Sequence, residues 1–180
     1  ILDPPQPVRL NGDIRGKVEF RNVSFRYPGA DEDVLHNISF SALPGETTAF
    51  IGSTGSGKST VVNLIPRFYD VTEGQILLDD IDIRTVTQHD LRDEIGYVPQ
   101  RGVLFSGTIA SNLRYANEFA GDDELLAAVA TAQAADFVGS KPEGLNAEIS
   151  QGGTNVSGGQ RQRLSIARAL VKKAPIYIFD

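Results

Sequence analysis

The 180-residue sequence contains no cysteine, only two histidines and no long apolar run. The absence of cysteine excludes a disulfide framework and a thiolate metal site. His36 and His89 are too few for a histidine-rich metal site, and we interpret them as solvated or turn residues. No apolar stretch approaches the ~18 residues that span a bilayer, and no signal peptide opens the chain. We therefore expect a soluble piece that faces the cytosol.

Positive charge is also scarce. The sequence has 17 Lys and Arg against 23 Asp and Glu, a formal net charge of -6. This balance argues against a nucleic-acid surface as the main function, so we expect no nucleic-acid partner. The hydrophobic content of 41% is enough to bury a core, and the length suggests one domain, or one domain with a subdomain.

The segment GSTGSGKST, at residues 52–60, matches the phosphate-binding pattern G-x-x-x-x-G-K-[ST]. Its glycines let the backbone fold around a phosphate without Cβ clashes, and its N–H groups point toward anionic oxygens. Lys58 would reach the β- and γ-phosphates, and the Ser59 hydroxyl would hold Mg²⁺. The predicted nucleotide-binding residues of this loop are Gly52, Ser53, Thr54, Gly55, Ser56, Gly57, Lys58, Ser59 and Thr60.

A second run of small residues, VSGGQ at residues 156–160, opens a predicted helix about 100 residues downstream. The Ser157 hydroxyl and the N–H groups of Gly158 and Gly159 suit close approach to an anion. Two glycines in a first turn cost helix propensity, so a helix cap alone does not explain them. This run cannot serve the loop's own nucleotide without a large fold-over, and it indicates a second anion contact.

Hydrophobic patterning predicts the elements around these motifs. Strands are expected at residues 18–27, 38–42, 47–51, 75–78, 96–99 and 176–179. The strand at 47–51 is nearly all apolar, as expected for a parallel strand covered on both faces. Helices are expected at residues 60–68 and 91–95, within 105–138, and at 160–172. On the last helix, we interpret Arg161, Arg163 and Arg168 as a solvated face.

The order of these elements predicts an α/β fold in which a P-loop core carries a mostly helical insertion near residues 101–165. Residues 1–17 are rich in proline and read as a linker. Asp180 follows the apolar strand IYIF, and in P-loop enzymes such an aspartate lies beside the Mg²⁺ site. Because the sequence stops there, straight after an apolar strand, we expect it to be incomplete at both ends.

From residue 18 to residue 180 the sequence resembles the nucleotide-binding domain of ATP-binding cassette (ABC) transporters, in the multidrug and lipid exporter branch. The motifs that carry the resemblance are FRYPG, GSTGSGKST (Walker A), YVPQ (the Q-loop), VSGGQ (the signature) and YIFD (Walker B). LFSGTIASNLRY is also typical of exporters. The resemblance implies a P-loop NTPase core of the ABC type with an antiparallel β-subdomain and a helical subdomain insertion.

The resemblance also assigns roles to single residues. Tyr27 would stack on adenine, and Gln100 would contact Mg²⁺ and the attacking water. Lys58, Gln100 and Asp180 would form the catalytic set, and Ser59, Gln100 and Asp180 would hold Mg²⁺. Residues of the signature would bind the γ-phosphate of ATP held by a second subunit; they are Ser157, Gly158, Gly159 and Gln160.

The sequence departs from the exporter pattern at three places. Val156 stands where leucine is usual. Gln151 stands where many exporters carry a glutamate that contacts the coupling helices of the transmembrane domain, which leaves that contact open. The catalytic carboxylate, the D-loop and the switch histidine would all follow Asp180.

The sequence is consistent with two functions. The domain is either an ATPase that powers export through nucleotide-dependent dimerisation, or a weakly hydrolysing half-site of a heterodimeric exporter; residue 181 would discriminate between them. A chromosome or DNA-repair type is disfavoured because only about 100 residues separate the P-loop from the signature, and an importer or translation-factor cassette is excluded less firmly.

The resemblance implies ATP and Mg²⁺ as cofactors, a second nucleotide-binding domain and coupling helices as partners, and a place at the cytoplasmic face of the cell membrane. The isolated 180 residues are expected to be inactive.

Overall fold

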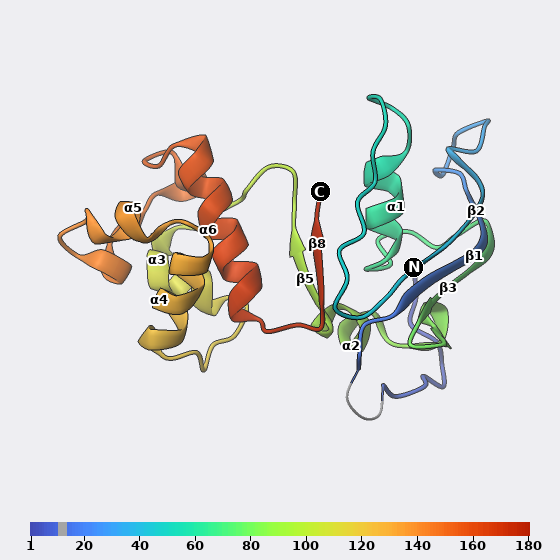
Figure 1. Cartoon of the computed structure of the whole chain (residues 1–180), viewed down its shortest axis with the longest axis horizontal. Coiled ribbons are helices and arrows are strands. Elements are labelled where there is room, and N and C mark those ends of the chain that lie inside the picture. The colour runs from blue at the N-terminus through green and yellow to red at the C-terminus, as the bar shows by residue number, and fades with distance from the viewer. Residues whose placement is uncertain (11–13) are drawn as a thin grey trace. The chain divides into compact units, whose positions relative to one another are not determined.

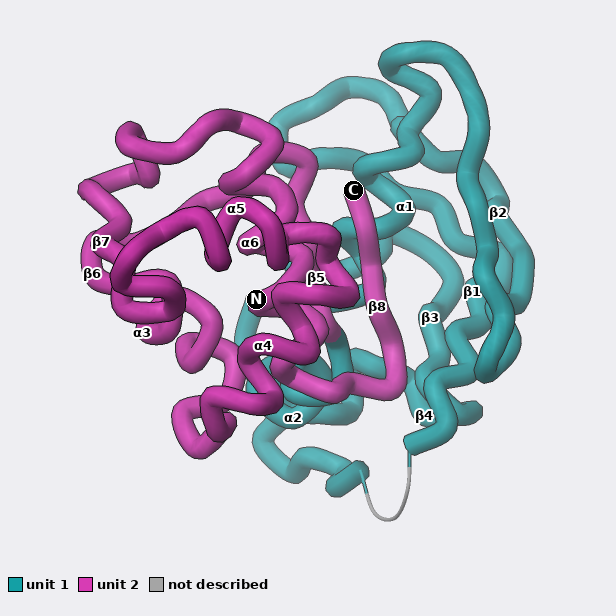
Figure 2. Tube along the Cα trace, turned by 60° about the vertical axis from the view of Figure 1, so that its left-hand side comes forward, with its two compact units in different colours: residues 1–95 teal, residues 96–180 magenta. Residues whose placement is uncertain are grey.

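A computed structural model describes residues 1–10 and 14–180, and the chain divides into two compact units, residues 1–95 and 96–180 (Figure 2). Residues 11–13 of the predicted linker lie outside the described residues. Figure 1 labels most of the helices and strands, and Figure 2 also labels β4, β6 and β7.

The first unit is built on a four-stranded sheet in the order β2-β1-β3-β4. Its strands are β1 (Val18–Phe25), β2 (Leu35–Ala42), β3 (Glu73–Leu78) and β4 (Ile81–Asp82). β1 pairs antiparallel with both β2 and β3, and β3 pairs antiparallel with β4. The expected antiparallel β-subdomain is therefore confirmed.

Side chains from the central strands fill the core beneath this sheet. Phe20, Phe25, Ile76 and Leu78 are each at most 2% exposed. Where β3 begins, Gly74 has a φ of +76°, and a Cβ there would lie 2.3 Å from the Asn22 carbonyl oxygen of β1. Only glycine permits this close approach of the two strands.

The strand expected at residues 47–51 is absent. Residues 47–53 have no regular structure, and Ile51 is 94% exposed. A strand exists through hydrogen bonds to neighbouring strands, and none of the described strands pairs with this segment. The expected burial is therefore also wrong, because an apolar pattern alone cannot supply a pairing partner.

Two short α-helices and a 3-10 turn complete the first unit. They are α1 (Lys58–Leu64), η1 (Ile83–Thr85) and α2 (Gln88–Asp93). α2 begins three residues before the predicted 91–95 because the Thr87 side chain accepts a hydrogen bond from the Asp90 N–H and caps the first turn.

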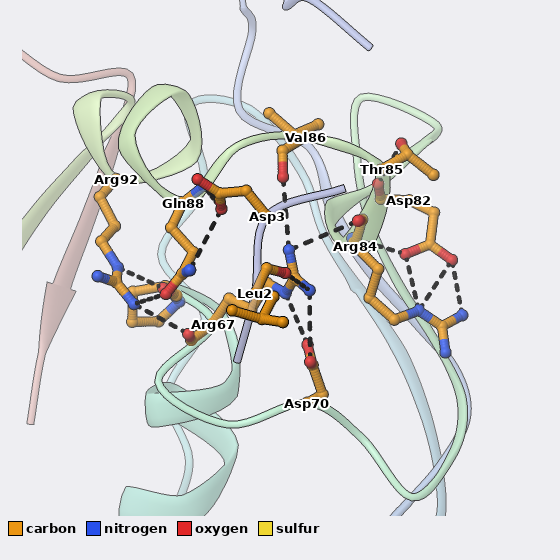
Figure 3. Close-up of polar contacts among 11 residues, drawn as sticks. Leu2, Asp3, Arg67, Asp70, Asp82, Arg84, Thr85, Val86, Gln88 and Arg92 are labelled. Atoms are coloured by element: carbon orange, nitrogen blue, oxygen red, sulfur yellow. Dashed lines mark hydrogen bonds and ion pairs between the residues drawn. The ribbon is translucent and has the colours of Figure 1, made fainter. Parts of the chain in front are cut away.

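Arg67, just beyond α1, lies at the centre of a polar junction (Figure 3). Its side chain is 6% exposed, and its Nε donates to Asp70 Oδ1 at 2.6 Å. Its terminal nitrogens also donate, over 3.4–3.5 Å, to three backbone carbonyls, those of Leu2, Arg84 and Val86. One buried cation thus ties the start of the chain to the end of the P-loop helix.

A second set of contacts runs beside the first (Figure 3). Asp3 Oδ1 accepts from the Gln88 backbone N–H at 2.8 Å and so caps the start of α2 from outside the helix. That hydrogen bond is the main reason why the pKa of Asp3 is lowered. From α2, Arg92 Nε donates to the Pro66 carbonyl at 3.0 Å. Asp3 thus holds the start of the chain against α2, and Arg92 joins α2 to the segment that follows α1.

Replacing Arg67 with methionine should destabilise the first unit by about 3 kcal/mol, because removing one partner leaves a charge and several carbonyls unpaired. Asp70 is 37% exposed, which places the effect at the lower end of the range for buried pairs. Urea unfolding would measure it. Arg84→Met is the control: Arg84 is 40% exposed and pairs with Asp82, so its loss should cost under about 1 kcal/mol. If the two substitutions lower the free energy of unfolding equally, the burial of the Arg67 junction does not add to stability.

The second unit combines a helical cluster with two small two-stranded sheets. Its helices are α3 (Ile109–Arg114), α4 (Asp122–Thr131), α5 (Ala135–Gly139) and α6 (Gly158–Val171), with 3-10 turns η2 (Gly144–Asn146) and η3 (Gln151–Gly153). Its strands are β5 (Ile95–Val98) paired with β8 (Ile176–Phe179), and β6 (Gly107–Thr108) paired with β7 (Glu148–Ile149). Leu113, Leu125 and Leu164, one from each of α3, α4 and α6, are fully buried in one core.

Among the described residues, no helix combines the length and the apolar character that crossing a membrane would require.

Candidate functional site

The P-loop enters α1 through a tight glycine turn. Gly55 and Gly57 have φ values of +82° and +86°, a region that L side chains rarely adopt. A Cβ on Gly57 would also lie 2.9 Å from the Leu35 side chain. Gly57 is the N-cap of α1 and has no side chain to accept the first N–H groups of the helix. The loop therefore has the backbone geometry expected for a phosphate cradle.

The Lys58 side chain folds back onto this loop and forms hydrogen bonds with it. Its Nζ donates to the carbonyls of Gly52 and Ser53 at 3.0 and 2.7 Å, and to Ser56 Oγ at 3.3 Å. All three acceptors belong to the predicted phosphate-binding segment. The ammonium group therefore lies where anionic oxygens enclosed by the loop would replace those acceptors.

Tyr27 lies next to the last residue of the P-loop. Its hydroxyl and the buried Thr60 Oγ1 are 2.9 Å apart and hydrogen-bonded. Its half-buried ring meets Phe25 and Tyr69 edge-on, with centroids 4.8 and 5.1 Å away. The structure thus brings the predicted adenine residue together with the predicted phosphate loop.

Tyr27→Ala should weaken ATP binding by about 1 to 3 kcal/mol if the ring stacks on the base. Tyr27→Phe keeps the ring and should leave ATP affinity nearly unchanged. Because Phe loses the hydrogen bond to Thr60, it should lower stability by about 1 kcal/mol. Calorimetric titration with ATP, together with urea unfolding, separates the two effects. If the alanine variant binds ATP as well as the wild type does, the ring serves only in packing.

Gln100 is exposed on the turn that follows β5. The backbone on both sides of it is held by α6: Gln162 Nε2 donates to the Pro99 carbonyl at 3.2 Å, and the Gly102 N–H donates to Gln162 Oε1 at 2.9 Å. Sequence reasoning did not single out Gln162. No motif marks it, and only its place on the predicted helix could have drawn attention to it.

Asp180 lies at the end of β8, beside β5. Its N–H donates to the Val98 carbonyl at 3.0 Å, and the Tyr97 hydroxyl donates to its Oδ2 at 3.4 Å. Burial, and then the nearby Asp180 carboxylate, raise the pKa of Tyr97 to about 12. Tyr97 therefore stays protonated at neutral pH and can donate to Asp180. Sequence reasoning also missed this partner.

The signature run forms the N-terminus of the 14-residue helix α6 through a capping box. Ser157 Oγ accepts from the Gln160 N–H at 3.2 Å, and Gln160 Oε1 accepts from the Ser157 N–H at 2.8 Å. The nearest atoms to a Cβ added at Gly158 or Gly159 would be arginine nitrogens at 3.8 and 3.7 Å, an ordinary contact distance. Packing within the chain therefore does not require these glycines, which supports a role in contacting something outside it.

The solvated arginine face predicted for α6 is wrong: Arg161, Arg163 and Arg168 are all partly buried, and the Nε of Arg163 is buried. Arg161 Nη1 donates to the carbonyls of Gly153 and Val156 at 3.0 and 2.8 Å. Arg168 Nη2 donates to the Val103 carbonyl at 2.9 Å, and burial lowers the pKa of Arg168. Their guanidinium groups satisfy loop carbonyls that approach the helix, contacts that helical periodicity cannot reveal.

The predicted site residues fall into two groups. The first unit holds Tyr27 and residues 52–60, whereas the second holds Gln100, Asp180 and residues 157–160. Each unit carries a coherent part of the motif set.

A glycine-lined loop opening a helix, a signature helix and a carboxylate at a strand end together define an ATP-binding domain of the cassette type. The family model described as "ABC transporter" matches residues 35–180. The chain belongs to the ABC transporter family.

Its relatives include exporters. An ATP-dependent lipid A-core flippase of Syntrophus aciditrophicus is 48% identical over 180 residues, which cover 100% of this chain and 30% of that protein. A Bacillus subtilis protein named for multidrug export ATP-binding and permease activity is 44% identical over 99% of this chain and 30% of its own length. A solved structure of a bacterial Atm1-family ABC exporter with ATP bound matches with a TM-score of 0.93 and 43% identity, covering 100% of this chain and 31% of that one. The chain thus spans about a third of the length of its relatives.

Proposed function

We propose that this chain is the ATP-hydrolysing domain of a membrane exporter, and that it acts by closing on a second nucleotide-binding domain around ATP. The observation that carries the proposal is the combination of a cradle in one unit, in which Lys58 faces the loop interior, with a signature helix whose glycines serve no packing need in the chain. The exporter relatives support the transport role.

The predicted ligands suit MgATP chemically. Mg²⁺ in nucleotide sites takes oxygen ligands, and Ser59, Gln100 and Asp180 each offer a side-chain oxygen. Bound Mg²⁺ would neutralise charge that develops on the phosphates. Lys58 would hold the β- and γ-phosphates, and Tyr27 would hold the base.

The helical unit also carries a surface suited to a transmembrane partner. Phe105 and Tyr115 are 46% and 73% exposed, and their rings lie 4.8 Å apart. Neighbouring exposed aromatic side chains often mark an interaction surface. We propose that the coupling helices of the transmembrane domain contact this surface, which would place the domain at the cytoplasmic face of the cell membrane.

Sedimentation tests the proposed ATP-dependent dimerisation. The sample is the nucleotide-binding domain of a full-length exporter that carries this chain. ATP should convert monomers to dimers, whereas ADP should not, because only ATP brings a γ-phosphate to the signature. Hydrolysis should accompany dimerisation. Dimers that form without turnover would favour the weakly hydrolysing half-site, and the absence of an ATP-dependent dimer would contradict both forms of the proposal.

A further inference from the structure

The turn that carries Gln100 is bracketed by one amide side chain. Gln162, half-buried on α6, donates to the carbonyl of Pro99 and accepts from the N–H of Gly102. Both hydrogen bonds have ordinary lengths, 3.2 and 2.9 Å, and they engage the backbone on either side of Gln100. A single side chain therefore fixes the two ends of this turn.

The same segment is pressed against α6 at two further points. A Cβ on Gly102 would lie 2.7 Å from Ser165 Oγ and 2.8 Å from the Arg161 carbonyl oxygen, so the backbone packs directly on the helix. One residue further along, the Val103 carbonyl accepts from Arg168 at 2.9 Å. In Figure 1 the yellow-green segment that follows β5 leads toward the side of α6. Residues 99–103 are thus held along the helix that begins at the signature.

We propose that Gln162 is a positioning residue for ATP hydrolysis, because it holds the turn from which Gln100 presents its side chain to the Mg²⁺-bound nucleotide. This inference rests on the proposed function and deepens it. Through Gln162, the position of Gln100 is fixed relative to α6, whose first turn carries the signature. Both hydrogen bonds of the Gln162 side chain engage backbone atoms, and the Gln100 side chain is exposed.

The chemistry of the bracket requires an amide. The Pro99 carbonyl needs a donor and the Gly102 N–H needs an acceptor, and glutamine supplies both from one planar group. Glutamate keeps the acceptor but brings a carboxylate against the Pro99 carbonyl, whereas leucine supplies neither. Gln162→Glu should therefore loosen one end of the turn, and Gln162→Leu should loosen both.

Hydrogen exchange without nucleotide tests the bracket itself. The Gly102 N–H should exchange faster by about tenfold or more in Gln162→Leu, and should stay protected in Gln162→Glu. Equal protection in wild type and the leucine variant would overturn the assignment, whatever the activity shows.

Kinetics in a full-length exporter that carries this domain test the positioning role. Both variants should lower kcat, by about 10- to 10²-fold in Gln162→Leu, as expected when a reacting group is misplaced. ATP affinity should change less than about twofold, because the P-loop of the first unit is untouched. Combining Gln162→Leu with Gln100→Ala should give the kcat of Gln100→Ala alone, whereas independent effects would multiply.

Glu124→Ala is the matched control for simple loss of stability. Glu124 lies in the same unit, where it accepts from the Gly121 N–H and pairs with Lys173, and both of these partners lie outside residues 99–103. Its loss should lower the unfolding midpoint while leaving kcat unchanged. Equal losses of kcat in the control and in Gln162→Leu, or effects that multiply with Gln100→Ala, would overturn the proposal. A wild-type protein that hydrolyses no ATP would instead contradict the proposed function.

Discussion

Replacing Lys58 with alanine should weaken ATP binding by about 2 to 3 kcal/mol, close to a hundredfold, and should weaken ADP binding less. The estimate follows from the strength of hydrogen bonds made by a charged group. In the structure the ammonium group already lies inside the loop, on the Gly52 and Ser53 carbonyls. A bound γ-phosphate would take over these contacts, and no other side chain of the loop is cationic.

Isothermal calorimetry with ATP and ADP measures both affinities. Lys17→Ala is the matched control, because Lys17 is a partly exposed lysine of the same unit that pairs with Glu19 and Asp80 on the sheet. It should leave both affinities unchanged. Equal ATP affinity in wild type and Lys58→Ala would remove the assignment of residues 52–60 as the phosphate site.

The motifs were more predictable from sequence than the contacts that support them. The P-loop was identified because its glycines and Lys58 have fixed spacing, and the structure gives the backbone φ values that this spacing requires. The resemblance implied the antiparallel β-subdomain, and the strands predicted at residues 18–27, from their alternation, and at 38–42 overlap β1 and β2 of the structure. Local patterns of this kind reflect local geometry, which is why they can be read from sequence.

What could not be predicted depends on contacts with segments outside a residue's own helix or strand. Arg161 and Arg168 look solvated by helical spacing, yet carbonyls from loops 5 to 65 residues away occupy their guanidinium groups. Residues 47–51 have the composition of a buried strand, but pairing is a property of two segments. Gln162 carries no motif, and its role depends on where the turn after β5 is placed.

Ser157→Ala should impair the ATP site of the partner subunit rather than the site of its own chain. At the partner's γ-phosphate, the loss of one preorganised donor should slow turnover about 10²-fold. Within its own chain, Ser157 Oγ accepts from the Gln160 N–H at the helix start, so alanine also costs about 1 kcal/mol of cap stability. Ser157→Thr keeps the hydroxyl and the cap, and should retain most of the activity.

Mixed dimers of a full-length exporter that carries this domain separate the two arrangements. When Ser157→Ala and Lys58→Ala lie on different subunits, action across the interface places both defects in one site, and about half of the activity should remain in the other. When both substitutions lie on one subunit, each site carries a defect, and turnover should fall about 10²-fold. Each kind of mixed dimer is purified through two affinity tags, one on each subunit. The opposite ranking would show that the signature acts on the nucleotide of its own chain, because only then would separating the substitutions damage both sites.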